Sequence, residues 1–496
     1  MNMNMNYIII IVLYYKHIFI LELNFIFNPM NLDSKIIQKT IQSLLTDVTP
    51  KVLTLLDDDV PEPRSEEQDQ KHHDTSEKRS LHNKTKKHHP KHDPATMLYE
   101  KINAASIELN TQNNAGCFKF QESAIDVQSQ VPHPETFSDK YLSREMRECI
   151  KNNSKKVLTF NCKINQRDIL LHFVLFKSHR CEESVSYYKT YAHRVFMWLH
   201  MVSLKSKCVE SLDIYIYLTP FKKELPENKS EVIGPVNANT GYTYRCEKKN
   251  EIVIYREEEW FKVLIHETMH TFGNDFDTED GIDDGVTTTM TYMKKIFSLP
   301  QGVDIRLSET YSEIWARIMN VAFQTYFKNP PSLESRNAKQ FKKNFEFYLH
   351  LESIFSLYQC IKILDFMGVN YQHLVNDSEH SRNMMRSFYR ENTHVFAYYV
   401  LTSILLNNRD DFLSWCVKNN GSGLNVFKVK VMQAEFATLI ASCYKKTDLL
   451  QKIVETEMKV ARDYQKAIST SSTNDNEGDN DNQLVTTLRM TIVGFD

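Results

Sequence analysis

The sequence has no pair or dense block of cysteines. Its nine cysteines are scattered from Cys117 to Cys443, their number is odd, and no two of them form a CxxC motif. Such a set does not indicate a disulfide framework. It favours a reducing compartment, in which the thiols serve as small buried hydrophobic groups.

An excess of charge of one sign is also absent. The formal net charge is −3 and the isoelectric point is near 6.7, which indicates neither a basic field for nucleic acid nor an acidic solvating tail. Basic and aromatic residues alternate in places between Tyr141 and Lys189. We interpret them as a solvated helical face, and no nucleic acid partner is expected.

The first residues lack the features of a secretory signal, since no basic segment precedes the apolar stretch and no small-residue cleavage site follows it. Residues 7–27 are about long enough to cross a bilayer, but four polar side chains interrupt them: Lys16, His17, Glu22 and Asn24. We interpret residues 1–29 as a hydrophobic leader or an upstream extension of the reading frame. Membrane anchoring through residues 7–27 stays open as the alternative, and the expected location is otherwise cytoplasmic.

With 496 residues, 42% of them hydrophobic, the chain has room for two or three domains. Residues 30–56 carry apolar side chains at helical spacing and predict an amphipathic helix. Residues 57–96 are rich in histidine and lysine and nearly devoid of apolar residues, which predicts a disordered linker. Residues 97–256 mix helix and strand, residues 257–467 are mainly helical, and residues 468–496 are interpreted as a polar tail.

The mixed segment contains several strand-like runs. Residues 168–176 and 212–221 predict two strands, with a helix between them in the chain. Residues 236–245 and 251–256 predict a hairpin, with the second run as an edge strand of the sheet.

Two histidines with a glutamate between them stand in the stretch VLIHETMHTFGNDF, residues 263–276. On a helix, His266 and His270 are four apart and share one face. Two imidazoles at this spacing can bind one Zn²⁺, whereas Glu267 points too far round to be a ligand but can hold a water molecule. The pattern therefore predicts a catalytic zinc site.

The helix that carries this motif is expected to span residues 257–272. Glu257, Glu258 and Glu259 would then lie in its first turn, where the helix dipole favours negative charge. Gly273 is placed to end the helix in the left-handed conformation. The alternative interpretation is a surface helix with two histidines that bind no metal.

A catalytic zinc site needs a third protein ligand and leaves the fourth position to water. The metzincin pattern would place a histidine at position 276, which is Phe276 here. Asp275 and Asp277 flank that position and are candidates. Further along, Glu309 and Glu313 are four apart and share one face of a second predicted helix, in LSETYSEIWARIMNVAF.

The chain resembles the gluzincins, and more narrowly the HExxH metallopeptidases encoded by large nucleocytoplasmic DNA viruses. The matching segments are VNANTGYTY, IVIYREEEWFKVLIHETMHTFG, SETYSEIWA and ENTHVFAYY, all between residues 236 and 400. The resemblance implies an α+β fold, with a zincin-like domain built from a small mixed sheet and an active-site helix, followed by a mainly helical C-terminal subdomain. It makes Glu309 the third ligand and Glu313 the carboxylate that orients a zinc-bound imidazole.

These features predict a peptidase with a Zn²⁺ cofactor bound by His266, His270 and Glu309, and with Glu267 as general base. The expected partner is a peptide or protein substrate, held in extended form by strand addition at residues 251–256. For a viral protein, the expected location is the infected-cell cytoplasm or the virion.

Tyr311, His394, Tyr398 and Tyr399 are further candidates, as groups that stabilise the transition state, and the alternative for each is a core or hydrogen-bonded residue. Two other functions stay open. One is a catalytically inactive scaffold with a zincin fold, and the other is a virion or assembly interaction protein. The intact Glu267 argues against the scaffold, because a structural metal site needs no general base.

Overall fold

The computed structural model of the chain describes residues 93–135, 141–176, 185–276, 284–328, 337–420, 433–470 and 483–494. The predicted leader, the predicted amphipathic helix and nearly all of the predicted linker lie outside the described residues, as does Asp277.

The first described helix, α4 (Pro94–Asn114), begins within the last residues that the sequence assigned to the linker. The carboxylate of Asp93 accepts hydrogen bonds from the backbone N–H groups of Ala95 and Thr96, and Pro94 occupies the first turn, where its missing N–H costs nothing. The helix therefore starts at a well-formed N-cap.

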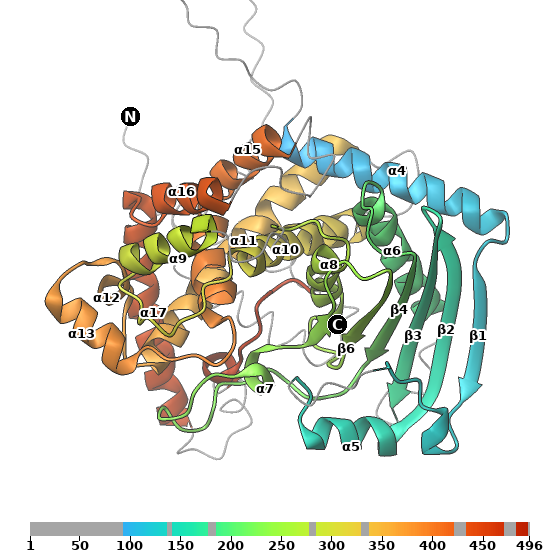
Figure 1. The fold of residues 1–496 in the computed structure, drawn as a ribbon, viewed down its shortest axis with the longest axis horizontal. Coiled ribbons are helices and arrows are strands. Elements are labelled where there is room, and N and C mark those ends of the chain that lie inside the picture. Colours follow the sequence, from blue (N-terminus) through green and yellow to red (C-terminus); the bar gives the residue numbers. More distant parts are fainter. Residues whose placement is uncertain are drawn as a thin grey trace, which may run out of the picture.

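Six strands of the described part of the chain form one mixed sheet, which lies at one end of the molecule (Figure 1). Their order across the sheet is β1-β2-β3-β4-β6-β5. The β3–β4 and β4–β6 pairs are parallel, and the other three pairs are antiparallel. The bounds are β1 (Lys119–Ala124), β2 (Ser154–Ile164), β3 (Arg167–Phe176), β4 (Ser211–Tyr217), β5 (Gly241–Thr243) and β6 (Lys249–Ile254).

The sequence predicted part of this sheet correctly. The strand-like runs at 168–176 and 212–221 correspond to β3 and β4, and the helix between them is α6 (Val185–Ser203). The hairpin is present as β5 and β6, although the start of its first arm is a helical turn, α7 (Pro235–Ala238). The edge-strand prediction for residues 251–256 is wrong, because β6 is paired on both sides and the three-residue β5 forms the edge.

The two faces of the sheet are covered by different layers. On β4, Leu212, Ile214 and Ile216 pack into the large core beneath the helices, whereas Tyr215 and Tyr217 pack into a smaller core with α5 (Arg144–Asn153). This alternation follows from the two-residue repeat of a strand. Both helices α6 and α8 (Trp260–Thr271) contact the sheet on the large-core side.

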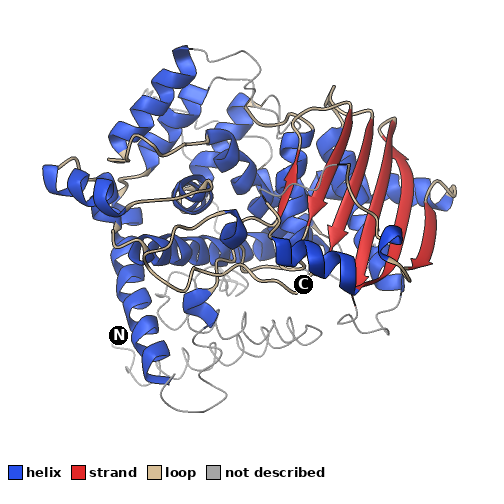
Figure 2. Cartoon of the chain, turned by 60° about the horizontal axis from the view of Figure 1, so that its bottom comes forward, coloured by secondary structure: helices blue, strands red, loops and turns tan. Residues whose placement is uncertain are grey.

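Helices make up the rest of the molecule, and Figure 2 shows them filling the side away from the sheet. At their centre α10 (Leu307–Lys328) is buried along nearly its whole length and packs against α8 and α11 (Ala338–Phe366). The others are α9 (Asp284–Ile296), α12 (Tyr371–Val375), α13 (Glu379–Phe388), the π-helix η2 (Phe396–Leu401), α14 (Thr402–Leu406), α15 (Arg409–Asn419), α16 (Gln433–Cys443) and α17 (Thr447–Thr470). The α+β prediction is confirmed at this level.

Residues 483–494 run through the interior, so their assignment to a polar tail is wrong. Leu488 and Thr491 are completely buried. Residues 483–486 form a helical turn. Beyond them side chains bind the backbone: Glu259 accepts from the N–H groups of Met490 and Thr491, and Glu352 accepts from that of Ile492. These bonds satisfy backbone groups that burial would otherwise leave unpaired.

Cys208 and Cys246 are joined by a disulfide bond. The expectation that the cysteines are thiols is therefore wrong for this pair. The bond ties the loop between α6 and β4 to the turn of the β5–β6 hairpin.

Among the described residues, no helix combines the length and the apolar character that crossing a membrane requires.

Candidate metal centre

The motif HETMH lies on α8, which is a central helix and not a surface helix. Every residue from Trp260 to Thr271 is buried. Gly273 has φ +59° and its N–H bonds to the carbonyl of His270, so the predicted helix end is confirmed. A histidine-bearing helix inside the core must have partners for its polar side chains.

The start of α8 differs from the expectation. Glu259 precedes the helix with φ +61°, and both Glu258 and Glu259 are buried. Glu258 accepts the backbone N–H of Lys223, and Glu259 is bonded to the ammonium group of Lys223 and to the C-terminal segment. These carboxylates therefore serve in long-range packing, and the prediction that Glu257, Glu258 and Glu259 lie in the first turn is wrong, because the helix begins at Trp260.

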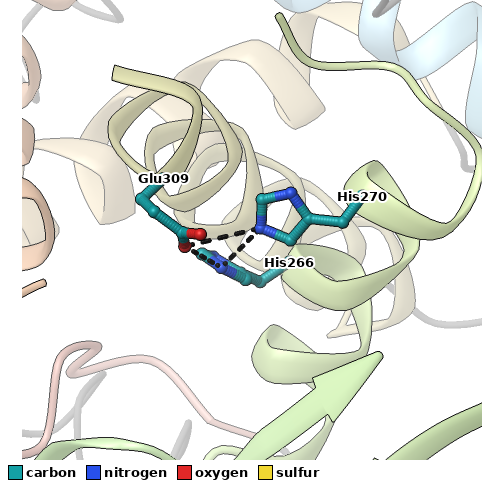
Figure 3. Close-up of side chains that lie close together, drawn as sticks. All are labelled: His266, His270 and Glu309. Carbon is teal, nitrogen blue, oxygen red and sulfur yellow. Dashed lines mark hydrogen bonds and ion pairs between the residues drawn. The ribbon is translucent and has the colours of Figure 1, made fainter. Parts of the chain in front are cut away.

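Helix α10 brings Glu309 and Glu313 against α8. The Nε2 atom of His266 lies 3.1 Å from Oε2 of Glu309, and Nε2 of His270 lies 3.2 Å from Nε2 of His266 and 3.4 Å from Oε2 of Glu309. Figure 3 shows the three atoms turned toward one another. His266, His270 and Glu309 thus form a group that could hold a metal ion.

The spacing of these three atoms fits a small tetrahedral cation. Ligands about 2.0–2.1 Å from a tetrahedral zinc ion are about 3.3–3.4 Å from one another, and the three sides of the triangle are 3.1, 3.2 and 3.4 Å. The side chains of His270 and Glu309 expose 11% and 17% of their surface. The group of His266, His270 and Glu309 is therefore reachable from solvent, as a catalytic metal site must be.

Each histidine is held at its other ring nitrogen by a carboxylate. The Nδ1 atom of His266 lies 3.1 Å from Oε2 of Glu313, and Nδ1 of His270 lies 2.6 Å from Oδ2 of Asp275. A histidine that donates its Nδ1 proton to a carboxylate leaves Nε2 unprotonated for a metal. Glu313 thus contacts the imidazole of His266, and Asp275 is the equivalent partner of His270, with its Oδ2 at the ring nitrogen that lies away from the triangle.

Both of these carboxylates are bonded to cations. Lys262, one turn before His266, lies 2.9 and 3.0 Å from the two oxygens of Glu313, and Nε of Arg317 lies 3.0 Å from Oε1. Arg245 binds both oxygens of Asp275, at 2.6 and 2.5 Å. These three basic residues were not among the sequence-based candidates, because their partners are 51, 4 and 30 residues away and only the Arg317 pair has a local spacing.

The charges around His266, His270 and Glu309 favour binding of a cation. Burial alone would lower the pKa of the His270 imidazole, but Glu309 and Asp275 raise that pKa well above its ordinary value. Burial opposes ionisation of Glu309, yet His270 and His266 together hold the pKa of its carboxyl well below the usual range. An ionised carboxylate thus faces two basic nitrogen atoms.

Glu267 has surroundings of another kind. It is buried, and burial raises the pKa of its carboxyl group. Within the described residues, no group donates a hydrogen bond to this carboxylate. A cavity of about 30 Å³ is lined by Glu267, His266, Tyr398, Thr240 and Gly241, among others, which is room for about two water molecules.

The hydroxyl group of Thr240 is buried and has no hydrogen-bond partner in the described structure. Gly241 follows it, and a Cβ atom there would lie 2.9 Å from a methyl group of Val263 and 3.0 Å from the carbonyl oxygen of Val253. Glycine therefore lets the edge strand β5 approach the motif helix. A water molecule in the cavity has both Thr240 and Glu267 available as partners.

The remaining candidates lie in different places. The hydroxyl of Tyr398, on the π-helix η2, donates to Oε2 of Glu309 at 3.0 Å. His394 is half-buried, with Nδ1 4.0 Å from Oε1 of Glu309. Tyr311 is fully buried among aromatic side chains, and its hydroxyl accepts a hydrogen bond from Asn420. The structure therefore brings Tyr398 and His394 to the site and places Tyr311 in the core.

A comparison of the chain with protein-family models, with curated proteins and with solved structures finds no match.

Proposed function

We propose that the chain is a zinc-dependent peptidase of the gluzincin type, with a zincin-like fold, as its resemblance to viral HExxH metallopeptidases implies. One observation carries the proposal: the triangle of His266, His270 and Glu309 has the spacing of tetrahedral zinc ligands and stands beside a buried, unpaired Glu267. Zinc held there supplies the Lewis acidity that activates water and polarises a carbonyl group.

The chain's own residues divide the work around the metal. Glu267, bonded to no other described group, accepts a proton from water and passes it to the leaving amine. Tyr398, whose hydroxyl donates to Oε2 of Glu309, would donate instead to oxygen on a substrate carbonyl. Asp275 and Glu313 keep the two imidazoles in the orientation that presents Nε2.

A substrate backbone has a place beside β5. The carbonyl of Thr240 bonds to the N–H of Tyr255, and the register continues as Gly241 opposite Ile254 and Tyr242 opposite Val253. In an antiparallel pair the bonded positions alternate, so the backbone groups of Gly241 and Thr243 point away from β6. An extended peptide that adds to this edge would lie near Glu267, since a Cβ atom on Gly241 would be 3.4 Å from Cγ of Glu267.

The inactive scaffold, the first alternative, keeps the same metal but needs no base. The surroundings of Glu267 favour the enzyme, because its carboxylate lines a cavity beside His266 and makes no described hydrogen bond that a scaffold would use. For the virion or assembly protein no feature of the described residues supplies comparable support. Two histidines and a carboxylate are also the ligand set of non-haem iron oxygenases. Bound zinc would favour the peptidase, and bound iron would favour an oxygenase.

The test is a comparison of wild type with Glu267→Gln. Zinc content, determined by mass spectrometry of the intact purified protein, should be about one per chain in both, because Glu267 is not a ligand. Hydrolysis of a mixed peptide library should fall at least about 10²-fold in the variant. Equal hydrolysis by both proteins would contradict the mechanism, and bound zinc with no hydrolysis by wild type would favour the scaffold.

A further inference from the structure

The corner where α8 ends is cross-linked to the turn of the β5–β6 hairpin. Arg245 and Cys246 form that turn, and Cys246 is bonded to Cys208 in the loop that precedes β4. The bond packs against the glycine that ends α8, since a Cβ atom on Gly273 would lie 3.2 Å from the Cys208 sulfur. The disulfide thus touches the end of the helix that carries both histidines.

Arg245 connects this turn to a metal-facing histidine. Its two terminal nitrogen atoms bind the two oxygens of Asp275, and Nη1 also donates to the carbonyl of Phe276 at 3.0 Å. Asp275 is completely buried and holds Nδ1 of His270 at 2.6 Å. A bidentate guanidinium fixes the plane of a carboxylate, so the direction of the bond to His270 depends on the position of Arg245.

The other histidine is supported differently. Lys262, which fixes Glu313 and through it His266, lies on α8 itself and is 2% exposed. Arg245 is 24% exposed and lies on a hairpin whose edge strand has three residues. The turn of this hairpin is held by the bonds from Asn250 to the carbonyl of Tyr244 and from the N–H of Glu210 to the carbonyl of Lys248, and the disulfide is the covalent link that anchors it.

We propose that Arg245 is a positioning residue for the metal centre, and that the Cys208–Cys246 disulfide holds it in place, so that metal affinity depends on the oxidation state of this cysteine pair. The inference rests on the proposed function only in taking His270 as a metal ligand. Reduction by a phosphine in water converts the disulfide to two thiols and the phosphine to its oxide. The freed turn then no longer constrains Arg245.

The experiment measures zinc affinity by competition with a chromophoric chelator, on the intact chain. Arg245→Met should weaken zinc binding about 10- to 100-fold, the usual loss when a group behind a metal ligand is removed. Arg245→Lys, which keeps the charge and one bond, should recover part of that loss. Cys208→Ser and Cys246→Ser should each weaken binding in the same direction, and so should wild type that has been reduced, alkylated with iodoacetamide and freed of reagents.

Lys248→Met is the matched control. Lys248 is a basic residue of the same hairpin turn, and its exposed side chain pairs with Glu210 and makes no described contact with Asp275. The absorption spectrum of the cobalt-substituted protein reports ligand geometry, and it should change in Arg245→Met and stay as wild type in Lys248→Met.

Failure of the inference and failure of the proposed function give different results. If wild type binds zinc but the Arg245 and cysteine variants bind it with the same affinity and the same cobalt spectrum, the inference is overturned while the metal centre stands. If wild type binds no zinc, the proposed function itself is overturned. Alkylation of Cys208 and Cys246 in the denatured, unreduced protein would also overturn the role of the disulfide.

Discussion

The ammonium group of Lys262 lies 2.9 and 3.0 Å from the two carboxylate oxygens of Glu313, and both side chains are almost completely buried. One of these oxygens, Oε2, also lies 3.1 Å from Nδ1 of His266. Burial opposes the charge on Glu313, but Lys262, His266 and Arg317 together hold the pKa of its carboxyl well below the ordinary value. The pair therefore sets the orientation of His266.

Replacing Lys262 with methionine should weaken zinc binding about 10- to 100-fold. Glu313 would keep its bond to Arg317 at Oε1 and lose the partner that fixes Oε2. The matched control is Lys362→Met. Lys362 is equally buried and donates to the carbonyls of Leu484 and Thr487, at the start of the C-terminal segment. Equal zinc affinities of the two variants, measured by chelator competition, would contradict the role assigned to Lys262.

The metal ligands give a direct prediction. Wild type should bind about one zinc per chain tightly, and His266→Ala and His270→Ala should lose it, because each removes one of three protein ligands. Glu313→Gln should keep the stoichiometry with reduced affinity. X-ray absorption at the zinc edge should report two imidazoles and one carboxylate oxygen at about 2.0–2.2 Å. If both histidine variants still bound one zinc per chain, the assignment of His266 and His270 as metal ligands would be wrong.

Tyr398→Phe should lower kcat about 10²-fold, the usual scale for loss of one donor to a developing oxyanion, with a much smaller change in KM. Tyr399→Phe is the control on the same π-helix, since the hydroxyl of Tyr399 donates to the carbonyl of Leu488. That variant should lose stability and keep its kcat. If steady-state kinetics give both variants the same kcat, Tyr398 is a structural residue.

Glu352 predicts a pH dependence of stability. Burial raises the pKa of its carboxyl to about 7 in the folded chain, above the ordinary value near 4.5. Between these values the folded chain holds a proton that the unfolded chain has released, so the free energy of unfolding falls as pH rises, by at most about 1.4 kcal/mol per pH unit. Glu352→Gln should lack this contribution.

Urea unfolding of wild type and Glu352→Gln at several pH values between 4.5 and 8 measures the difference. The variant should gain stability relative to wild type as pH rises through the window and level off above pH 7. Parallel profiles for the two proteins would show that Glu352 does not titrate there.

The part of the site that could be predicted from sequence is the part with local spacing. His266 and His270 are four apart, as are Glu309 and Glu313, so helix geometry alone places each pair on one face. Asp275 was considered as a ligand, but its bond to the other nitrogen of His270 depends on how the chain turns after Gly273. The partners Lys262 and Arg245 bind carboxylates that are 51 and 30 residues away, and no periodicity encodes such pairs.

The fold errors have a similar origin. Residues 251–256 have the pattern of a strand, but which strand is outermost depends on the three residues of β5, too few to show a pattern. Only residues 483–486 of the C-terminal segment are helical. The backbone of residues 490–492 is bound by Glu259 and Glu352, and such long-range bonds leave no periodic pattern in the sequence. The disulfide was missed because Cys208 and Cys246 are 38 residues apart and belong to no spacing motif.

The burial of residues 483–494 has a consequence for biosynthesis. A ribosome makes α8 and α10 long before it makes this segment, so a nascent chain can carry every metal-binding side chain while Glu259 and Glu352 still lack their N–H partners. During that interval two carboxylates of the future core face water or one another. The interior around α8 and α11 therefore completes its hydrogen bonds only after these late residues leave the ribosome.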